Sequence, residues 1–245
     1  MPSGAGRLGF WYLQDRGTIS KKVLVFYDPL TNGPNGNTNY YNSGDVTPAQ
    51  IYATIQAREN ALGFTTTFVQ SYAALASYDL SQYAHIWDVG YASPYTTNPY
   101  DPTSQLTTYL KNGGAMFMLG ENAGFGVRDD TIDNFITGLG GGNVTRSTSS
   151  YGYSVVTTID PQFLLVNNVN KVTFSAPGGF ISIGTGTAMT TAFAESIYVA
   201  AMWKTNSLAN APRGAVVSVL DVNFLVGIHI QPSFIDNLIY SMNLK

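Results

Sequence analysis

Short apolar runs alternate with helical patterns over residues 22–140, and this alternation constrains the fold more than any other feature. The apolar runs lie at residues 23–27, 64–69, 84–89 and 115–119, and the helical patterns lie at residues 48–62, 103–110 and 128–139. Strands that alternate with helices at such spacings form parallel sheets with helices on both faces. We therefore expect a three-layer α/β sandwich with a mainly parallel central sheet.

Two of these helices carry N-terminal signals in the sequence. Thr47 precedes Pro48, and Gln50 completes a capping box, so we expect a helix to begin there. Asp101-Pro102 has the same form, an N-cap residue followed by proline, and it predicts the start of a second helix.

The pattern changes in the second half of the chain. Residues 143–205 place short β-type runs between Gly- and Thr-rich turns, at residues 154–158, 172–174, 190–193 and 197–203. A buried strand run at 215–220 and an amphipathic helix at 232–244 follow. We expect an N-terminal arm at residues 1–21 and one α/β domain at 22–245. Within this domain, residues 143–205 form a β-rich extension that adds antiparallel strands to the sheet.

The fourth apolar run leads into the turn Gly120-Glu121-Asn122-Ala123-Gly124. A strand, a G-x-Nu-x-G turn and a helix form the layout of a nucleophile elbow, which exposes its central side chain at the top of a sheet. The central residue is Asn122, and an amide has no proton that a base can remove to make a strong nucleophile. The chain contains no Cys that could substitute. An ordinary strand-to-helix turn has the same sequence form, so both interpretations stay open.

Four segments share the pattern of a known superfamily: residues 22–28, 109–120, 214–224 and 234–239. Through them the chain resembles the class I glutamine amidotransferase-like superfamily, in its flavodoxin-like, trehalose-utilisation-protein-like branch. The resemblance covers most of residues 22–244 and implies a flavodoxin-like fold.

Active members of that superfamily use an elbow Cys together with a His and a Glu after a late strand. In this chain Asn122 takes the Cys position, His229 fits the His position, and Gln231 stands where the acid would be. Gln cannot stabilise a charged imidazolium as a carboxylate does. The resemblance therefore implies a fold whose usual catalysis is lost, and we expect no catalytic residues.

Acidic residues follow the ends of several expected strands: Asp28, Asp88, Glu121 and Asp221. Ligands of open α/β sheets bind at this carboxyl edge. Carboxylates there could coordinate a divalent cation or perform acid–base chemistry. Asp also caps turns at strand ends, and we favour this plainer interpretation.

Tyrosines gather in or beside the loops 29–46 and 90–100, which we expect above the same edge. They are Tyr27, Tyr40, Tyr41, Tyr91, Tyr95 and Tyr100. Tyr with Asn and Gly is typical of adaptable recognition surfaces, including surfaces that bind sugars. For a chain with so few charges, we favour a contact with another subunit.

His85 and His229 are the only histidines. His85 lies inside an apolar strand run and is interpreted as a core histidine, and His229 is also interpreted as structural. The chain lacks a Cys cluster and lacks histidines at ligand spacing, so we expect no metal site and no cofactor.

Charged residues make up only 11% of the chain, and the net charge is −3. Without a basic stripe we expect no nucleic-acid binding through phosphate neutralisation and no polybasic membrane anchor. No apolar stretch approaches the roughly 18 residues of a membrane span. The first residues lack the regions of a secretory signal. A surface rich in Asn, Thr and Tyr then fits a virion assembled in a host cytoplasm, or an extracellular protein whose signal has been removed.

The N-terminal arm contains Phe10-Trp11-Tyr12, three apolar residues that are costly to leave in water. We expect this arm to dock on another protein subunit, and packing on its own domain is the alternative.

Three functional hypotheses follow. The first is a non-catalytic structural or interaction protein, most consistent with a bacteriophage virion component of the tail, baseplate, fibre or capsid. The second is a secreted or surface carbohydrate-binding module. The third is a hydrolase with metal- or water-based chemistry, oriented by Asp28, Glu121 and Asp221.

Overall fold

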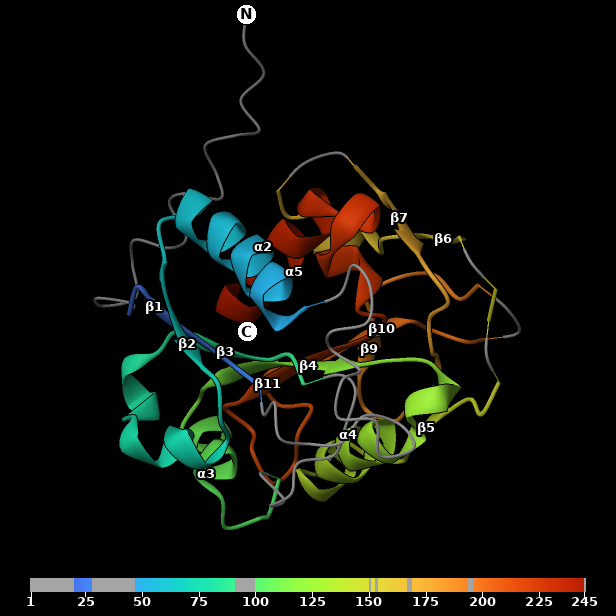
Figure 1. Cartoon of the computed structure of the whole chain (residues 1–245). Helices are drawn as coiled ribbons and strands as arrows, with labels where there is room; N and C mark the ends of the chain where they lie inside the picture. The colour runs from blue at the N-terminus through green and yellow to red at the C-terminus, as the bar shows by residue number, and fades with distance from the viewer. Residues whose placement is uncertain are drawn as a thin grey trace, which may run out of the picture.

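The computed structural model describes residues 20–27, 47–90, 100–149, 151–152, 154–166, 169–193 and 196–244. At its centre lies a seven-stranded sheet with strand order β2-β1-β3-β4-β11-β10-β9 (Figure 1). In that order the strands are Thr65–Val69, Lys22–Phe26, His85–Asp88, Ala115–Gly120, Ala215–Leu220, Ala200–Trp203 and Thr187–Ala188. The first five are mutually parallel, and β10 and β9 are antiparallel additions. The mainly parallel, flavodoxin-like sheet is therefore confirmed.

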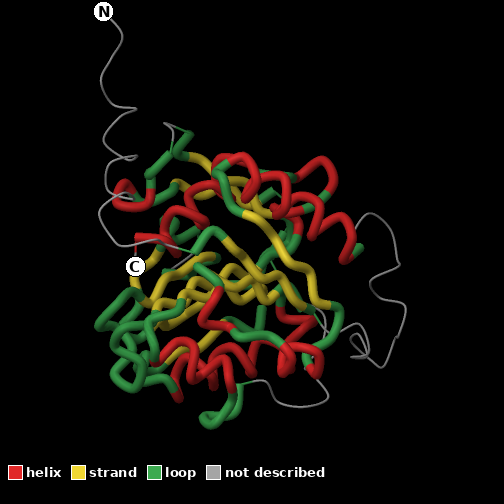
Figure 2. The backbone as a smooth tube through the Cα atoms, turned by 90° about the vertical axis from the view of Figure 1, so that its left-hand side faces the viewer, coloured by secondary structure: helices red, strands yellow, loops and turns green. Residues whose placement is uncertain are grey.

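Helices cover both faces of the sheet, as Figure 2 shows. Helices α2 (Pro48–Ala61) and α5 (Pro232–Leu244) pack on one face, and α3 (Gln105–Lys111) and α4 (Gly126–Gly138) pack on the other. Because successive side chains of a strand point to opposite faces, each central strand contributes to two separate hydrophobic cores. In β1, for example, Val25 packs in the core beneath α2 and α5, whereas Leu24 packs in the core beneath α3 and α4.

The N-terminal signals in the sequence predicted the start of one helix correctly and misplaced the start of the other. Thr47 forms the expected capping box: its hydroxyl accepts from the Gln50 amide at 3.2 Å, and its own amide donates to the Gln50 side chain at 2.8 Å. The expected start at Asp101-Pro102 was wrong. Ser104 caps α3 instead, and the Asp101 carboxylate accepts from the Thr103 amide in the preceding turn.

The β-rich segment extends the sheet and also builds two small sheets. Strands β9 and β10 continue the central sheet, as expected. Two further antiparallel pairs form apart from it: β5 (Val144–Arg146) with β8 (Phe180–Ile183), and β6 (Val155–Thr158) with β7 (Lys171–Phe174). The strand expected at residues 190–193 is wrong, because Thr190 makes only an isolated bridge to Ile159.

Several expectations concern residues outside the described part of the chain. They include the arm residues Phe10, Trp11 and Tyr12, the strand-end residue Asp28, and the loop residues Tyr40, Tyr41, Tyr91 and Tyr95. These expectations stay predictions. Among the described helices, none has the length and apolar character needed to cross a membrane.

His85 is a core histidine, as the sequence predicted, and its partner is a buried carboxylate on α2. Its Nε2 lies 2.6 Å from Oε1 of Glu59, which also accepts from the indole of Trp87 at 2.7 Å. Glu59 and His85 are both fully buried. The contact joins α2 to β3 by a polar link in an otherwise apolar layer.

Gly114 allows the chain to enter β4 beneath Tyr109 of α3. A Cβ atom at Gly114 would lie 2.2 Å from a carbon of the Tyr109 ring. The Tyr109 hydroxyl is held 3.2 Å from the carbonyl oxygens of Tyr83 and Ala84, so this ring cannot easily move.

We expect the Gly114→Ala substitution to lower the free energy of unfolding by about 1–3 kcal/mol through overpacking. The matched control is Gly138→Ala at the end of α4, where no atom lies within 4 Å of the new Cβ. Because Ala is the better helix former, the control should be neutral or stabilising by up to about 1 kcal/mol. Urea denaturation measures both, and equal effects would contradict the account of the Tyr109 contact.

Candidate functional site

The turn after β4 is the position of the proposed nucleophile elbow. Asn122 has φ −71° and ψ 175°, an ordinary extended conformation. Its side-chain oxygen accepts from the Gly124 amide at 2.9 Å and so caps the short 3₁₀ turn Ala123–Phe125. A nucleophile elbow instead holds its central residue on a strained turn. The geometry at Asn122 therefore favours the ordinary strand-to-helix turn.

His229 and Gln231 lie between β11 and α5, at the same carboxyl edge of the sheet. The 3₁₀ turns Asn223–Leu225 and Gly227–His229 occupy the apolar run that follows β11. The Gln231 side chain donates to the carbonyl oxygen of His229 at 3.0 Å. Its backbone amide donates to the carbonyl oxygen of Phe224, also at 3.0 Å. In this structure Gln231 thus holds the turn that leads into α5.

A buried ion pair fills the space where β3 and β4 end. The Arg128 guanidinium donates to Asp88 at 2.8 Å, to the Tyr100 hydroxyl at 2.7 Å and to the Leu119 carbonyl oxygen at 3.0 Å. The Tyr100 hydroxyl also donates to Asp88. Arg128 and Asp88 are both fully buried. The sequence marked Asp88 as a possible ligand residue and Tyr100 as part of a possible contact surface, and the structure places both inside this network.

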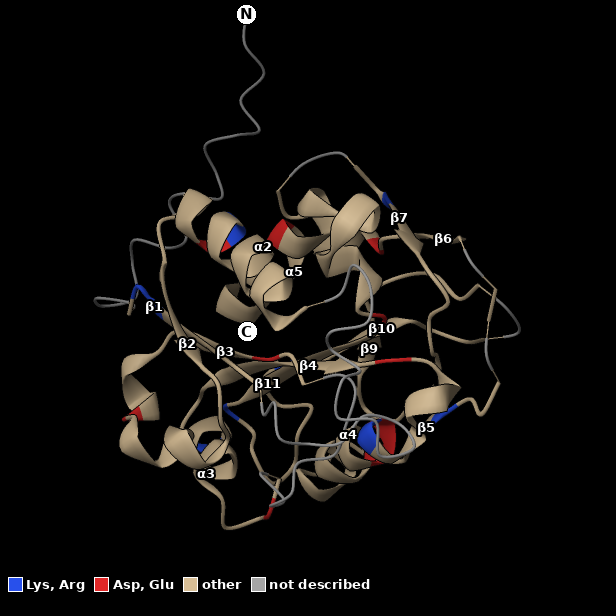
Figure 3. Ribbon diagram, viewed as in Figure 1, with Lys and Arg blue, Asp and Glu red and all other residues tan. Residues whose placement is uncertain are grey.

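Three further carboxyl groups are buried beside the ion pair: Glu121, Asp129 and Asp221. Figure 3 shows acidic and basic segments meeting at the start of α4, while charges are sparse over most of the described chain. The Glu121 amide donates to Asp129 at 3.0 Å. Asp221 accepts from the amides of Ser175 at 2.8 Å and Asn223 at 2.7 Å. Oε1 of Glu121 has no hydrogen-bond partner among the described residues.

Burial raises the pKa values of these three groups. For Glu121, burial is the largest cause, and the charges of Asp221 and Asp129 raise its pKa further. Burial raises the pKa of Asp129 to about 8, against the opposing effects of the Glu121 amide and Arg146. It likewise raises the pKa of Asp221 to about 7. At neutral pH Asp129 is therefore mainly protonated and Asp221 is partly protonated, since the charged form is costly to bury.

Arg146 of β5 closes the outer side of this cluster. Its Nη2 donates to the carbonyl oxygen of Gly126 at 2.8 Å and also contacts Asp130. Its Nε lies 4.0 Å from Asp129 and 3.9 Å from Asp133. The β-rich segment therefore supplies a cation to α4, a contact that joins the two halves of the chain.

The expected strand-end acids are brought together in part. Glu121 and Asp221 follow the adjacent strands β4 and β11 and interact electrostatically, whereas Asp28 lies outside the described residues. Within the described ranges, no three His, Cys, Asp or Glu side chains are arranged to hold a metal ion. Both oxygens of Asp221 accept backbone amides. The strand-end acids are therefore accounted for by contacts within the fold, with Arg128, with backbone amides and with one another.

Sequence reasoning missed Arg128 because it looks like an ordinary first-turn residue of a helix.

No protein-family model matches the chain, and no curated protein matches it in sequence. Solved structures do match in fold. The mmIFT52 N-terminal domain superposes with a TM-score of 0.58 at 11% identity, over 89% of this chain and 93% of that domain. A putative ThuA-like protein from Bacteroides uniformis gives a TM-score of 0.51 at 11% identity, over 93% of this chain and 92% of that protein. At such identities the likeness shows a shared fold alone, and it agrees with the fold expected from the sequence.

We expect Arg128→Met to lower the free energy of unfolding by about 3–5 kcal/mol, because Asp88 would keep a buried charge without its partner. Arg58→Met is the matched control. It removes an ion pair between the partly exposed Arg58 and the buried Asp236, and should cost about 1–3 kcal/mol. Urea denaturation of both variants makes the comparison. A loss at Arg128 as small as the loss at Arg58 would show that the buried pair does not hold this edge together.

The buried acids predict an unusual pH dependence. Folded-state pKa values above the ordinary 3.8 mean that the folded protein binds more protons than the unfolded chain between about pH 4 and 8. The free energy of unfolding should therefore fall as the pH rises through this window. Asp129→Asn, which keeps an oxygen acceptor for the Glu121 amide, should reduce the fall by at least about 1.4 kcal/mol, the equivalent of one pKa unit.

Asp101→Asn provides the control for this measurement. The hydroxyl and amide of Thr103 lower the pKa of the exposed Asp101, so this group titrates below the window. Its replacement should leave the slope between pH 5 and about 8 unchanged. If Asp129→Asn also leaves the slope unchanged, Asp129 is ionised in the folded protein and the description of the cluster is wrong.

Proposed function

We propose that the protein is a non-catalytic interaction protein built on an amidotransferase-like fold. The observation that carries this proposal is the state of Asn122. By the sequence resemblance it takes the position of the superfamily's nucleophile, while in the structure its backbone is unstrained and its side chain caps the following turn. Gln231 at the acid position is likewise used to hold a backbone turn. At two positions that the superfamily's catalysis would require, the residues thus stabilise local turns.

The fold by itself does not decide between functions, because one fold supports many unrelated activities. Among the proteins with this fold, one is named only as the N-terminal domain of mmIFT52 and another as a putative ThuA-like protein. An interaction role for this chain is consistent with such variety. Its support comes from the residues of the site.

Exposed apolar side chains at the carboxyl edge support a contact with another protein. Ile228, in the turn between β11 and α5, is 95% exposed, and Val127, at the start of α4, is 64% exposed. The segments that carry them follow the neighbouring strands β11 and β4, so both residues belong to the same edge of the sheet. Burial of a large apolar side chain in an interface gains about 1.5–3 kcal/mol. We propose that this edge, together with the N-terminal arm, contacts other subunits.

The more specific proposal is a bacteriophage virion component, located in the virion and assembled with other protein subunits. Its support is the sequence: 11% charged residues, a surface rich in Asn, Thr and Tyr, and the apolar arm with Phe10, Trp11 and Tyr12. Such a surface adheres to neighbours with little electrostatic repulsion. The hydrolase alternative would be favoured instead by chelator-sensitive hydrolysis that Glu121→Gln abolishes.

Deletion of residues 1–19 tests the role of the arm. The deletion stops before Ser20, whose hydroxyl donates to the carbonyl oxygen of Gln82 and so belongs to the domain. We expect the shortened protein to keep its thermal unfolding transition and to lose assembly with itself or with co-expressed neighbouring gene products. Sedimentation velocity measures assembly, and calorimetry measures folding.

Two outcomes would count against the assembly role. Unfolding of the shortened protein would mean that Phe10, Trp11 and Tyr12 complete the domain's own core. Unchanged assembly would mean that the contact lies elsewhere, and Ile228→Ser then tests whether the carboxyl edge alone provides it.

A further inference from the structure

A cavity of about 740 Å³ lies at the end of the sheet opposite the elbow. Its floor comes from residues that precede three neighbouring parallel strands: Ser20 before β1, Ala84 before β3, and Gly114 before β4. It is therefore at the amino edge of the sheet, and it shares no residue with the cluster around Glu121. The volume falls within the range of small-molecule sites.

One wall of the cavity is the outer face of α3. Gln105, Thr108 and Asn112 line it, and their spacing of three and four residues places them on one side of the helix. The opposite side of α3 is buried in the core through Leu106 and Leu110. The wall thus presents amide and hydroxyl groups, which donate and accept hydrogen bonds without carrying charge.

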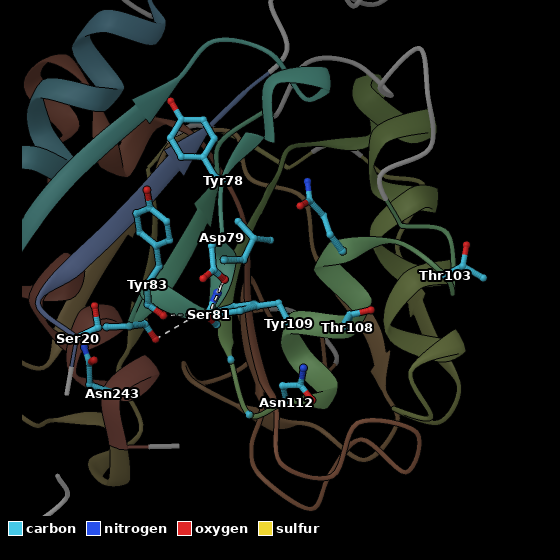
Figure 4. A pocket seen from close by; sticks show the side chains of 15 residues that line it. Ser20, Tyr78, Asp79, Ser81, Tyr83, Thr103, Thr108, Tyr109, Asn112 and Asn243 are labelled. Carbon is cyan, nitrogen blue, oxygen red and sulfur yellow. Dashed lines mark hydrogen bonds between the residues drawn. The ribbon is translucent and has the colours of Figure 1, made fainter. Parts of the chain in front are cut away.

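The facing wall comes from the segment between β2 and β3, and Figure 4 shows Tyr109 lying between the two walls. Tyr78 and Tyr83 stand on this segment with their rings 6.5 Å apart in an edge arrangement. Both rings are half-buried and provide apolar surface beside polar groups. Asp79 and Ser81 lie beside them, with the Ser81 hydroxyl donating to the Asp79 carboxylate at 2.6 Å.

The charge of this lining restricts what it can bind. Among the described residues that form it there is no Lys, Arg or His, and Asp79 is the single acid. Hydrogen bonds from Ser81 lower the pKa of Asp79, so its carboxylate is ionised at neutral pH. An anionic ligand such as a phosphate or carboxylate would meet repulsion and no balancing cation. An apolar ligand would leave the Gln105, Thr108 and Asn112 groups without partners.

We propose that this cavity binds an uncharged, polyhydroxylated ligand of the sugar class. Sugar hydroxyls both donate and accept, so they match the mixture of amides, hydroxyls and one carboxylate. The C–H face of a sugar ring packs against aromatic rings, which Tyr78 and Tyr83 supply. This inference goes beyond the proposed interaction role and uses a different edge of the sheet. Loss of assembly tests the role of the arm, whereas ligand titration tests the cavity, so either idea can fail alone.

The test is an NMR titration of the full-length protein with methyl glucoside and N-acetylglucosamine as neutral probes. Glucuronate serves as an anionic analogue and glucosamine as a cationic one. We expect saturable binding of a neutral probe with Kd on the order of 1 mM or tighter. Shifted resonances should map to Ser81, Thr108 and Asn112. Glucuronate should bind at least about 5-fold more weakly because of Asp79.

Two variants locate the binding. Tyr83→Ala removes one ring of the apolar surface, and Thr108→Val removes a hydroxyl from the exposed face of α3 with little change of shape. Each should weaken binding at least about 5-fold, in keeping with the loss of one good contact. Thr137→Val, at an exposed position of α4 outside the cavity, is the matched control and should change nothing.

The proposal is overturned by any of three results. The first is no saturable binding of either neutral probe on the order of 10 mM. The second is tighter binding of glucuronate or glucosamine than of the neutral probes, which would assign a charged ligand. The third is binding that Thr108→Val and Tyr83→Ala leave unchanged while both remain folded. Should Tyr83→Ala fail to fold, Thr108→Val decides the question alone.

Discussion

The ion pair between Arg128 and Asp88 is the interaction on which the carboxyl edge of this protein depends. A guanidinium removed from water must find hydrogen-bond partners and a counter-charge in fixed positions. A buried charge without a partner lowers the free energy of unfolding far more than a typical substitution does. Arg128 meets this requirement through Asp88 of β3, the carbonyl of Leu119 in β4 and the hydroxyl of Tyr100. Through these contacts Arg128 connects α4 to β3, to β4 and to the segment that contains Tyr100.

The same requirement explains the acids around the pair. Glu121, Asp129 and Asp221 lie where β4, β11 and α4 meet, at the place where a fold of this type usually exposes reactive groups. Here their polar atoms largely face backbone amides, and burial favours the protonated forms. The close fit also constrains the backbone. A Cβ at Gly120 would lie 2.7 Å from an Asp129 oxygen, so a larger residue would separate the strand from the helix.

The two edges of the sheet therefore differ in character. The carboxyl edge, in its described part, is held by buried charges and carries exposed apolar side chains such as Ile228. The amino edge instead contains a cavity lined mainly by uncharged polar groups and tyrosines, with Asp79 as its single acid. The Arg128 contacts join β3, β4 and α4 at the first edge. The second edge keeps polar side chains available to a ligand, because α3 turns only one of its faces toward the core.

Local patterns in the sequence determined the layers of the structure. Alternating strand and helix segments predicted the parallel sheet, and the Thr47 box predicted the start of α2, since both depend on neighbours a few residues apart. The same local reasoning misplaced the start of α3, where Ser104 competes with Asp101 as a cap. It also expected a strand at residues 190–193, where a short run of β-forming residues finds only a single bridge.

Tertiary structure alone decided which polar groups meet. Arg128 and Asp88 are 40 residues apart, and Glu59 and His85 are 26 apart. Each contact depends on strand order and on how a helix packs over the sheet, which neighbouring residues do not encode. From the sequence, Asp88 was a possible ligand, and Glu59 carried no signal that marked it as a partner of His85. The amino-edge cavity was equally hidden, because its lining comes from segments that the sheet brings together only after the chain has folded.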